Sequence, residues 1–172
     1  MAVLETERLI LRPLTLEDVD DLAAIYADPD VMRFFDGVHS WETTRKRVEQ
    51  IVAEYTRTGV DFMATIYKDN GQFIGRCGLL WQVIEGVQEV EVAYMLAKPY
   101  WGRGLGTEAA RAIKEHGFRD FDFPRLISLI HPDNAASIRV AEKNGMHYDR
   151  DVAFDGHPCR LYLIDRDKHA SA

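Results

Sequence analysis

Three glycines at alternate positions, Gly102, Gly104 and Gly106, stand directly before a run of helix-forming residues. Glycine has no side chain, so the backbone there can approach a ligand closely. The first N–H groups of a helix have no partner within the helix, and they therefore point at such a ligand and favour an anion. The spacing predicts a loop that binds a phosphate group at the start of a helix. The alternative is a strand-to-helix turn that needs glycine only for its shape.

Two common nucleotide-binding motifs do not fit these glycines. A P-loop requires Gly-Lys-Ser/Thr after a spacer, and the sequence does not contain that arrangement. The dinucleotide fingerprint G-x-G-x-x-G requires glycine where Thr107 stands, and it belongs to serial βαβ units. What remains is a loop of backbone donors that can hold a pyrophosphate, with Arg103 as an optional charged partner.

The segments on either side of the loop predict a crossover connection. Residues 89–96 alternate in polarity, which predicts a strand with Glu89 and Glu91 on one face. After the loop, a helix is expected to about Asp120, followed by an apolar strand at 126–130. Because strand–helix–strand units cross over right-handed within one sheet, these two strands are expected to be parallel.

The rest of the chain predicts further elements around this crossover. Asn-Gly between two β-rich runs is a hairpin signal, and the second to fourth strands are therefore expected to form an antiparallel meander. We predict a mixed α/β (α+β) fold, a single domain over residues 1–172 with a mostly antiparallel sheet of about seven strands, one parallel crossover and helices on both faces. The expected strands are 7–13, 61–67, 72–81, 89–96, 126–130, 146–154 and 159–165; further helices are expected from a Thr15 cap to about Ala27, from Ser40 to Gly59 and from Asn134 to Asn144, and a frayed tail from about 166 to 172.

Composition excludes several classes of protein. A formal net charge of −7 argues against non-specific binding to nucleic acid, which requires a basic surface. The sequence shows no apolar run of membrane-spanning length, and acidic Glu5 and Glu7 stand where a signal peptide would be basic, so the expected location is the cytoplasm. Cys77 and Cys159 lack CxxC spacing and could pair only if the fold brings them together, and no metal site is expected.

The run from Tyr100 to Ala109, YWGRGLGTEA, resembles the acetyl-CoA signature Q/R-x-x-G-x-G/A of the GNAT superfamily of N-acetyltransferases. Trp101 stands where Gln or Arg is common, but Trp-Gly is typical of the branch that resembles ribosomal-protein N-terminal acetyltransferases (RimJ/RimL-like). Other stretches resemble that branch in the same order along nearly the whole chain, namely Thr6–Pro13, Asp28–Met32, Asn134–Ser137 and Glu142–Met146.

The resemblance implies how acetyl-CoA, the acyl donor, would be held. The fourth and fifth strands would splay apart to admit the pantetheine arm, which the backbone of Tyr94, Met95 and Leu96 would bond as an added strand would. Asn134 would contact the pantetheine, cap its helix, or do both. The pyrophosphate would be held by the amides of the loop, contributed by Arg103, Gly104, Leu105, Gly106 and Thr107.

The implied reaction requires a proton acceptor, because an amine attacks a thioester only when it is neutral and free amines are largely protonated near pH 7. Glu91 is the predicted base, on the strand that leads into the loop, and Glu89 on the same face is the second choice. The alternative for Glu91 is a solvated strand residue. The usual acid, a tyrosine seven residues after the asparagine, is replaced by Ala141.

Other residues could supply the missing proton donor. Ser137, one turn after the asparagine, either donates to the sulfur or is an ordinary first-turn helix residue. Tyr94 is a further possible donor, with core packing as its other possible role. His131 ends a strand, where a lone histidine is expected to be structural.

The acceptor would be a primary amine, either a protein N-terminus or a small molecule. The walls of the acceptor-binding site are expected in the 28–41 loop and the 154–159 turn, with Phe34, Phe35 and Trp41 as candidate contacts. Phe34 and Phe35 could instead belong to the core. The alternative function is a non-catalytic acetyl-CoA-binding regulatory module. The closing hairpin either offers an edge to a second copy, giving a possible homodimer, or is covered.

Overall fold

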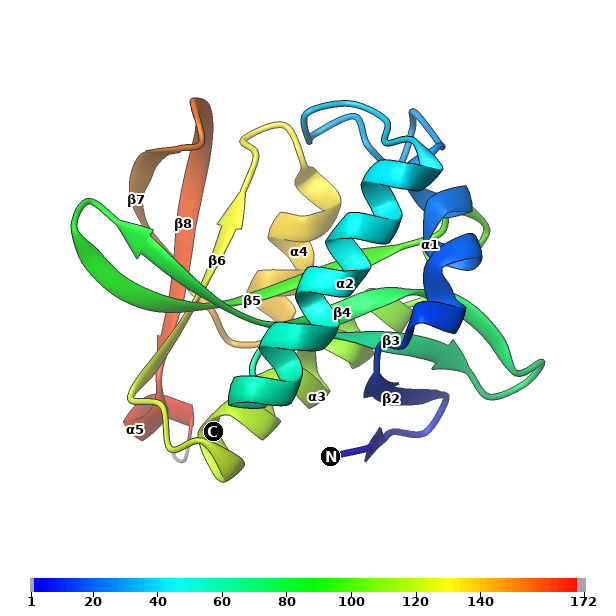
Figure 1. Cartoon of the computed structure of the whole chain (residues 1–172). Helices are drawn as coiled ribbons and strands as arrows, with labels where there is room; N and C mark the ends of the chain where they lie inside the picture. Colours follow the sequence, from blue (N-terminus) through cyan, green and yellow to red (C-terminus); the bar gives the residue numbers. More distant parts are fainter. Residues whose placement is uncertain (1, 170–172) are drawn as a thin grey trace.

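The computed structural model describes residues 2–169 and places their strands in one mixed sheet (Figure 1). The strand order is β1-β2-β3-β4-β5-β6-β8-β7, and β5–β6 is the parallel pair. The prediction of about seven strands is confirmed, with the two-residue β1 in addition. The strands are β1 (Leu4–Glu5), β2 (Leu9–Pro13), β3 (Phe62–Tyr67), β4 (Gln72–Ile84), β5 (Val87–Leu96), β6 (Arg125–Ile130), β7 (His147–Phe154) and β8 (His157–Asp165).

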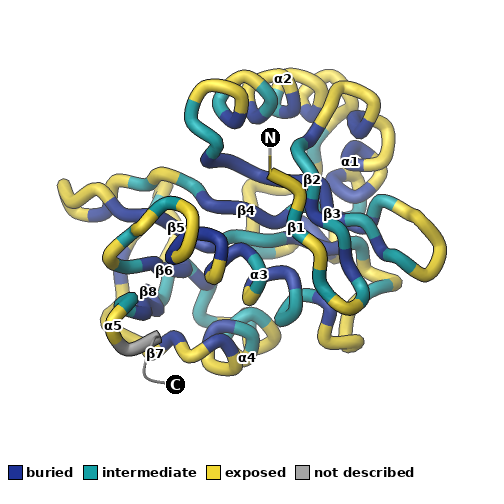
Figure 2. The backbone as a smooth tube through the Cα atoms, turned by 90° about the horizontal axis from the view of Figure 1, so that it is seen from below, coloured by how far each residue is buried: buried dark blue, intermediate teal, exposed yellow. Residues whose placement is uncertain are grey.

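Helices cover both faces of the sheet, as expected. α1 and α2 lie on one face and α3 and α4 on the other, with the buried strands between them (Figure 2). The predicted frayed tail is wrong for residues 166–169, which form a short helix, and residues 170–172 lie outside the described part. The helices are η1 (Leu16–Asp18), α1 (Val19–Tyr26), α2 (Trp41–Thr58), η2 (Lys98–Tyr100), α3 (Leu105–Asp120), α4 (Ala135–Lys143) and α5 (Arg166–His169).

The predicted helix ends have the chemistry that their residues suggested. The Ser40 hydroxyl accepts the N–H of Thr43 at 3.2 Å at the start of α2, and Gly59 ends that helix with a φ of 74°. The Asn134 side chain likewise accepts the N–H of Ser137 at 3.1 Å at the start of α4. Within residues 2–169, no helix is long and apolar enough to cross a membrane.

The sheet opens between β5 and β6. Their register holds one matched pair, Glu91 with Ile127, and beyond it β6 rises away from β5 (Figure 1). Ser128 Oγ donates to the Val92 carbonyl at 2.8 Å, and Trp101 Nε1 donates to the Leu96 carbonyl at 2.7 Å, so these carbonyls face away from β4. Because backbone groups alternate along a strand, the N–H and C=O of Tyr94, midway between them, face the opening.

The start of α3 is tied to the first long strand. The Glu108 carboxylate accepts the Thr6 hydroxyl at 2.6 Å, and the backbone N–H and Nε of Arg8 at 2.8 and 2.7 Å. Arg8 also donates through Nη1 to the carbonyl of Arg103 at 2.9 Å. The stretch before β2 therefore fixes both the glycine loop and the helix that follows it.

Candidate active site

Two adjoining cavities meet at the opening between β5 and β6. The central cavity, of about 570 Å³, is lined by Arg76 and Glu91 from the α2 side and by Ala110 and Ala141 from the α3 and α4 side, so it passes through the sheet. The loop cavity, of about 620 Å³, lies over the glycines. Residues shared by both cavities join them into one space: Phe34, Phe35, Tyr94, Met95, Asn134, Ser137 and Val140.

The glycine loop presents free backbone donors to the loop cavity. The first bond within α3 runs from the N–H of Glu108 to the carbonyl of Gly104, at 3.1 Å, so the preceding N–H groups have no helical partner. Gly104 has a φ of 78°, which only glycine adopts readily. Any side chain at Gly106 would meet the Tyr94 ring at 3.1 Å. The N–H groups of Leu105, Gly106 and Thr107 thus form a compact cradle of free donors at the start of a helix, an arrangement that suits an anion.

Arg103 does not take part in this cradle through its side chain. Its Nη2 donates to the Tyr67 hydroxyl at 2.7 Å, and its guanidinium lies 4.8 Å from the centroid of the Tyr67 ring, outside the lining of both cavities. Cations from two segments line the loop cavity instead: Arg33 from the 28–41 loop, and Arg139 and Lys143 from α4. Helical spacing places Arg139 and Lys143 on one face of α4, but no local signal joins Arg33 to them, because the fold alone brings the two segments together.

Glu91 is a buried acid in the central cavity. Its side chain accepts Gln82 Nε2 at 2.7 Å and the backbone N–H of Leu129 at 3.3 Å, and 7% of the residue is exposed. Burial raises the pKa of Glu91 to about 7, against the opposing effect of those two donors and of Arg76. A carboxyl that titrates near neutral pH can accept a proton from a bound ligand.

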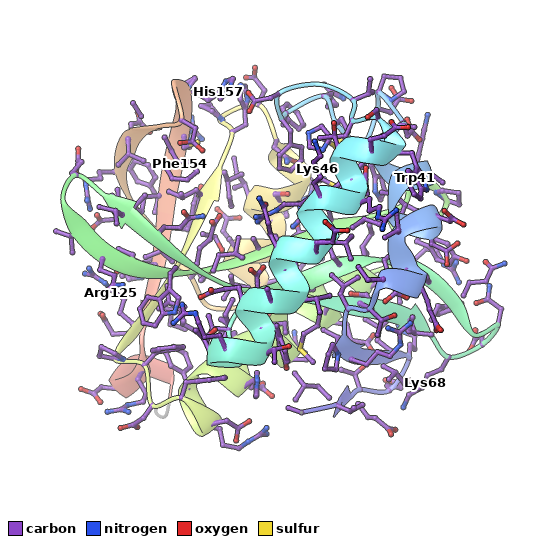
Figure 3. All side chains as sticks on the ribbon, in the orientation of Figure 1. Trp41, Lys46, Lys68, Arg125, Phe154 and His157 are labelled. Carbon is purple, nitrogen blue, oxygen red and sulfur yellow. The ribbon has the colours of Figure 1, made fainter. Side chains whose placement is uncertain are left out.

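Glu89, the second choice for the base, is engaged elsewhere. Its carboxylate forms an ion pair with Arg125, whose Nε lies 3.2 Å from it, and it lines neither cavity. The two glutamates share a face of β5, so alternation could not separate them. Figure 3 shows Arg125 at the lower edge of the sheet, away from the α2 end where Lys46 lies.

Tyr94, Ser137 and Asn134 form a connected polar group where the two cavities meet. The Tyr94 hydroxyl donates to Ser137 Oγ at 3.1 Å, and the Ser137 backbone N–H donates to Asn134 Oδ1. This leaves the Ser137 hydroxyl hydrogen and the Asn134 side-chain amide hydrogens available to a ligand. Burial raises the pKa of Tyr94 to about 12, so its hydroxyl stays protonated.

The 28–41 loop and the β7–β8 turn meet above the central cavity. Asp36 Oδ1 and His157 Nε2 lie 2.6 Å apart, and the Phe34 ring stacks on His131 with centroids 5.0 Å apart. Phe34 and Phe35 line both cavities, as a pocket wall would. These contacts give the cavity a roof built from segments far apart in sequence.

Trp41, the third predicted wall residue, lies outside both cavities. Its indole Nε1 donates to Asp20 Oδ1 at 2.7 Å, and the residue is 43% exposed, on the α1 side of α2 (Figure 3). Of the two cysteines, both free thiols, Cys159 lines the central cavity and Cys77 is buried. The described residues 2–169 include no group of three or more His, Cys, Asp or Glu that could hold a metal ion.

Comparisons with known proteins agree with this geometry. The family model for the acetyltransferase (GNAT) domain matches residues 8–147. The uncharacterized protein YkkB of Bacillus subtilis (strain 168) is 38% identical over 162 residues, covering 92% of this chain and 93% of its own.

Two solved structures share the fold. An acetyltransferase (GNAT family) from Bacillus anthracis superposes with a TM-score of 0.82 at 24% identity, covering 96% of this chain and 99% of its own. The ribosomal L7/L12 α-N-protein acetyltransferase RimL, in complex with coenzyme A, superposes with a TM-score of 0.80 at 20% identity, covering 95% and 98%.

Proposed function

The chain belongs to the GNAT acetyltransferase family, whose acyl donor is acetyl-CoA, and we propose that it moves the acetyl group to a primary amine by direct attack on the thioester. The observation that carries this proposal is Glu91, a buried carboxyl with a pKa of about 7 beside the opening between β5 and β6. A non-catalytic module would not need such a group, and its burial there has an energetic cost.

The two cavities suit the parts of acetyl-CoA. The free amides of Leu105, Gly106 and Thr107 would hold the pyrophosphate, with Arg33, Arg139 and Lys143 nearby to offset its charge. The backbone of Tyr94 to Leu96 would bond the pantetheine, and the free amide hydrogens of Asn134 face the same space. The acetyl group would then lie in the central cavity, on the side of Glu91.

The reaction needs one proton removed and one supplied. A new N–C bond forms as the C–S bond breaks, and the proton leaves the amine for the Glu91 carboxylate, directly or through water. The departing thiolate takes a proton from a hydroxyl, which regains one from solvent, and Glu91 releases its proton to solvent before the next turnover. The backbone N–H of Tyr94, which faces the opening, would stabilise the oxyanion. Glu91 and the opening thus supply the base and the electrostatic stabilisation from one strand.

Ser137 is the proposed proton donor to the thiolate. Since its Oγ already accepts the Tyr94 hydroxyl, its own hydrogen is free to point at the sulfur, and Ala141 leaves that space unfilled. We expect Ser137→Ala to lower kcat by about tenfold or more with little change in the acetyl-CoA Kd. An unchanged kcat, measured at saturating acceptor, would remove Ser137 from the mechanism.

The experiment that tests the reaction type is an acceptor screen. Purified protein is incubated with acetyl-CoA and a panel of primary amines, each matched by the alcohol of the same skeleton, and both CoA thiol and acetylated product are quantified. We expect equal amounts of thiol and N-acetyl product from amines alone. Thiol release without an acetylated amine would contradict the proposal. The cytoplasmic location and the homodimer stay predictions.

A further inference from the structure

Three cations without a carboxylate partner gather on one wall of the central cavity. Other arginines form ion pairs, for example Arg12 with Asp18 and Arg150 with Glu85. Among residues 2–169, by contrast, no carboxylate oxygen lies within 4.0 Å of the charged nitrogens of Lys46, Arg47 and Arg76, and all three line the cavity. In a chain with a formal net charge of −7, such a group of unpaired cations implies an anionic ligand.

Two of these cations come from a polar stripe on α2. Thr43, Lys46, Arg47 and Gln50 recur at helical spacing and all line the central cavity. The stripe lies beside the buried positions Thr44, Val48, Ile51 and Tyr55, which pack towards the sheet. α2 therefore presents donors to the cavity along two turns, and Figure 3 shows Lys46 at the upper end of this helix, near the roof.

The side chain of Arg76 is fixed in an orientation that leaves both of its terminal nitrogens free to donate. Its guanidinium carbon lies 3.5 Å from the centroid of the Phe62 ring, and its Nε donates to the Tyr26 hydroxyl. Its Nη1 and Nη2 have no hydrogen-bond partner among residues 2–169. A planar guanidinium fixed by stacking and by Nε, with its ends free, matches the geometry of a carboxylate.

Among the described residues, four acids line the central cavity or lie near this wall, and none of them forms an ion pair with its three cations. Arg47 and Arg76 act to lower the pKa of Asp61, but burial raises it overall, and that carboxyl does not line the cavity. Asp36 is already bound to His157 across the roof. Two further carboxylates line the cavity: Asp155, which is exposed in the β7–β8 turn, and Glu91, whose proposed task is to accept a proton.

Arg76 and Glu91 lie on the same face of the β4–β5 hairpin. Arg76 pairs with Met95 and Leu80 pairs with Glu91, so their Cα atoms are about 13 Å apart along the sheet. Two long side chains shorten that gap to one that a small molecule can bridge.

Resting on the acetyl transfer proposed above, we infer that the acceptor is a free amino acid, whose amine lies against Glu91 while its carboxylate is held by Arg76, with Lys46 and Arg47 adding positive charge. Such a ligand places its amine beside the acid of the cavity and its carboxylate beside the cations at the same time. Polyamines and other polycations would be repelled by the same three side chains, and a neutral amine would leave them without a partner.

The test compares matched acceptors in the wild-type enzyme. The common amino acids and their primary amides are supplied with acetyl-CoA, diamines are included, and kcat/KM is referred to the neutral amine. We expect at least one amino acid to exceed its own amide by about 10- to 100-fold. If amides or diamines are acetylated as well as the acids, the carboxylate inference is wrong while the transferase proposal stands. If no amine is acetylated, both fail.

Variants locate the effect. Arg76→Met keeps a side chain over Phe62 and removes the guanidinium, so it should abolish the preference for the acid: within this variant, kcat/KM for the acid should fall to that for its amide. Tyr26→Phe frees Nε without removing the charge and should reduce the preference in part. Arg57→Met, which removes a cation of α2 that lines neither cavity, is the control and should keep the preference. Thermal unfolding and acetyl-CoA titration verify that each variant is folded; a preference retained in folded Arg76→Met would overturn the assignment.

Discussion

Replacing Glu91 with glutamine is expected to lower kcat for acetyl transfer by about 100- to 1,000-fold, while the Kd for acetyl-CoA changes by less than twofold. Glutamine has the same shape and can still accept the N–H of Leu129, so the cavity should keep its form. It cannot take a proton from the amine. Steady-state kinetics at saturating acceptor, with calorimetry for the cofactor, separate these two effects.

The matched control is Glu89→Gln, the same substitution two residues earlier on the same face of β5. Glu89 is bound to Arg125 and lines neither cavity, so its replacement should change kcat by less than about threefold, whatever it does to stability. Equal losses in the two variants would mean that charge on β5, and not proton transfer at Glu91, supports the reaction. An active Glu91→Gln enzyme would exclude Glu91 as the base.

Replacing Gly104 with valine is expected to weaken acetyl-CoA binding by about 100-fold or more. Gly104 has a φ of 78°, and a β-branched residue is strongly disfavoured there, so the loop must change its backbone conformation. The amides of Leu105 to Thr107 would then no longer converge on one anion. Calorimetric titration with acetyl-CoA measures the loss directly.

Gly86→Val separates the general cost of strain from the loss of the cradle. Gly86 has a φ of 82° in the turn between β4 and β5, has nothing within 4 Å of its missing side chain, and lines neither cavity. This variant should lose stability and still bind acetyl-CoA with wild-type affinity. Normal binding by folded Gly104→Val would show that the glycine loop is only a turn.

Much of the fold could be predicted because its signals are local. The Ser40 hydroxyl and the left-handed Gly59 mark the two ends of one helix, and both act through atoms within a few residues. The crossover between β5 and β6 followed from the order of strand and helix. The two-residue β1 and the helical turn at 166–169 carry no such pattern, and neither was predicted.

The site could be predicted only in part. The sequence shows which reactive residues share one strand or loop, but it does not show which residues from different elements the fold brings together. Alternation placed Glu89 and Glu91 on one face but could not show that Arg125 would bind the first. The indole of Trp41 was predicted to line the acceptor site, but in the structure it is hydrogen-bonded to Asp20 instead. The proposed role of Arg76 in binding a carboxylate was missed, because it depends on contacts with Tyr26 and Phe62, which come from different elements.

The roof of the cavity shows the same limit. Asp36 and His157 are 121 residues apart, and neither belongs to a periodic pattern. Their contact exists because the sheet brings the β7–β8 turn beside the loop that follows α1. Long-range contacts of this kind decide the shape of the acceptor site, which is why the sequence indicated a primary amine without choosing among amines.

The most direct test of the central claim, that Glu91 accepts the proton of the attacking amine, is the dependence of kcat on pH in the wild type and in Glu91→Gln. With a pKa of about 7, Glu91 should make the wild-type kcat rise about tenfold per pH unit below 7 and level off above it. That inflection should be missing in Glu91→Gln, while any inflection of the amine itself stays in both. The same inflection near pH 7 in both enzymes would contradict the claim.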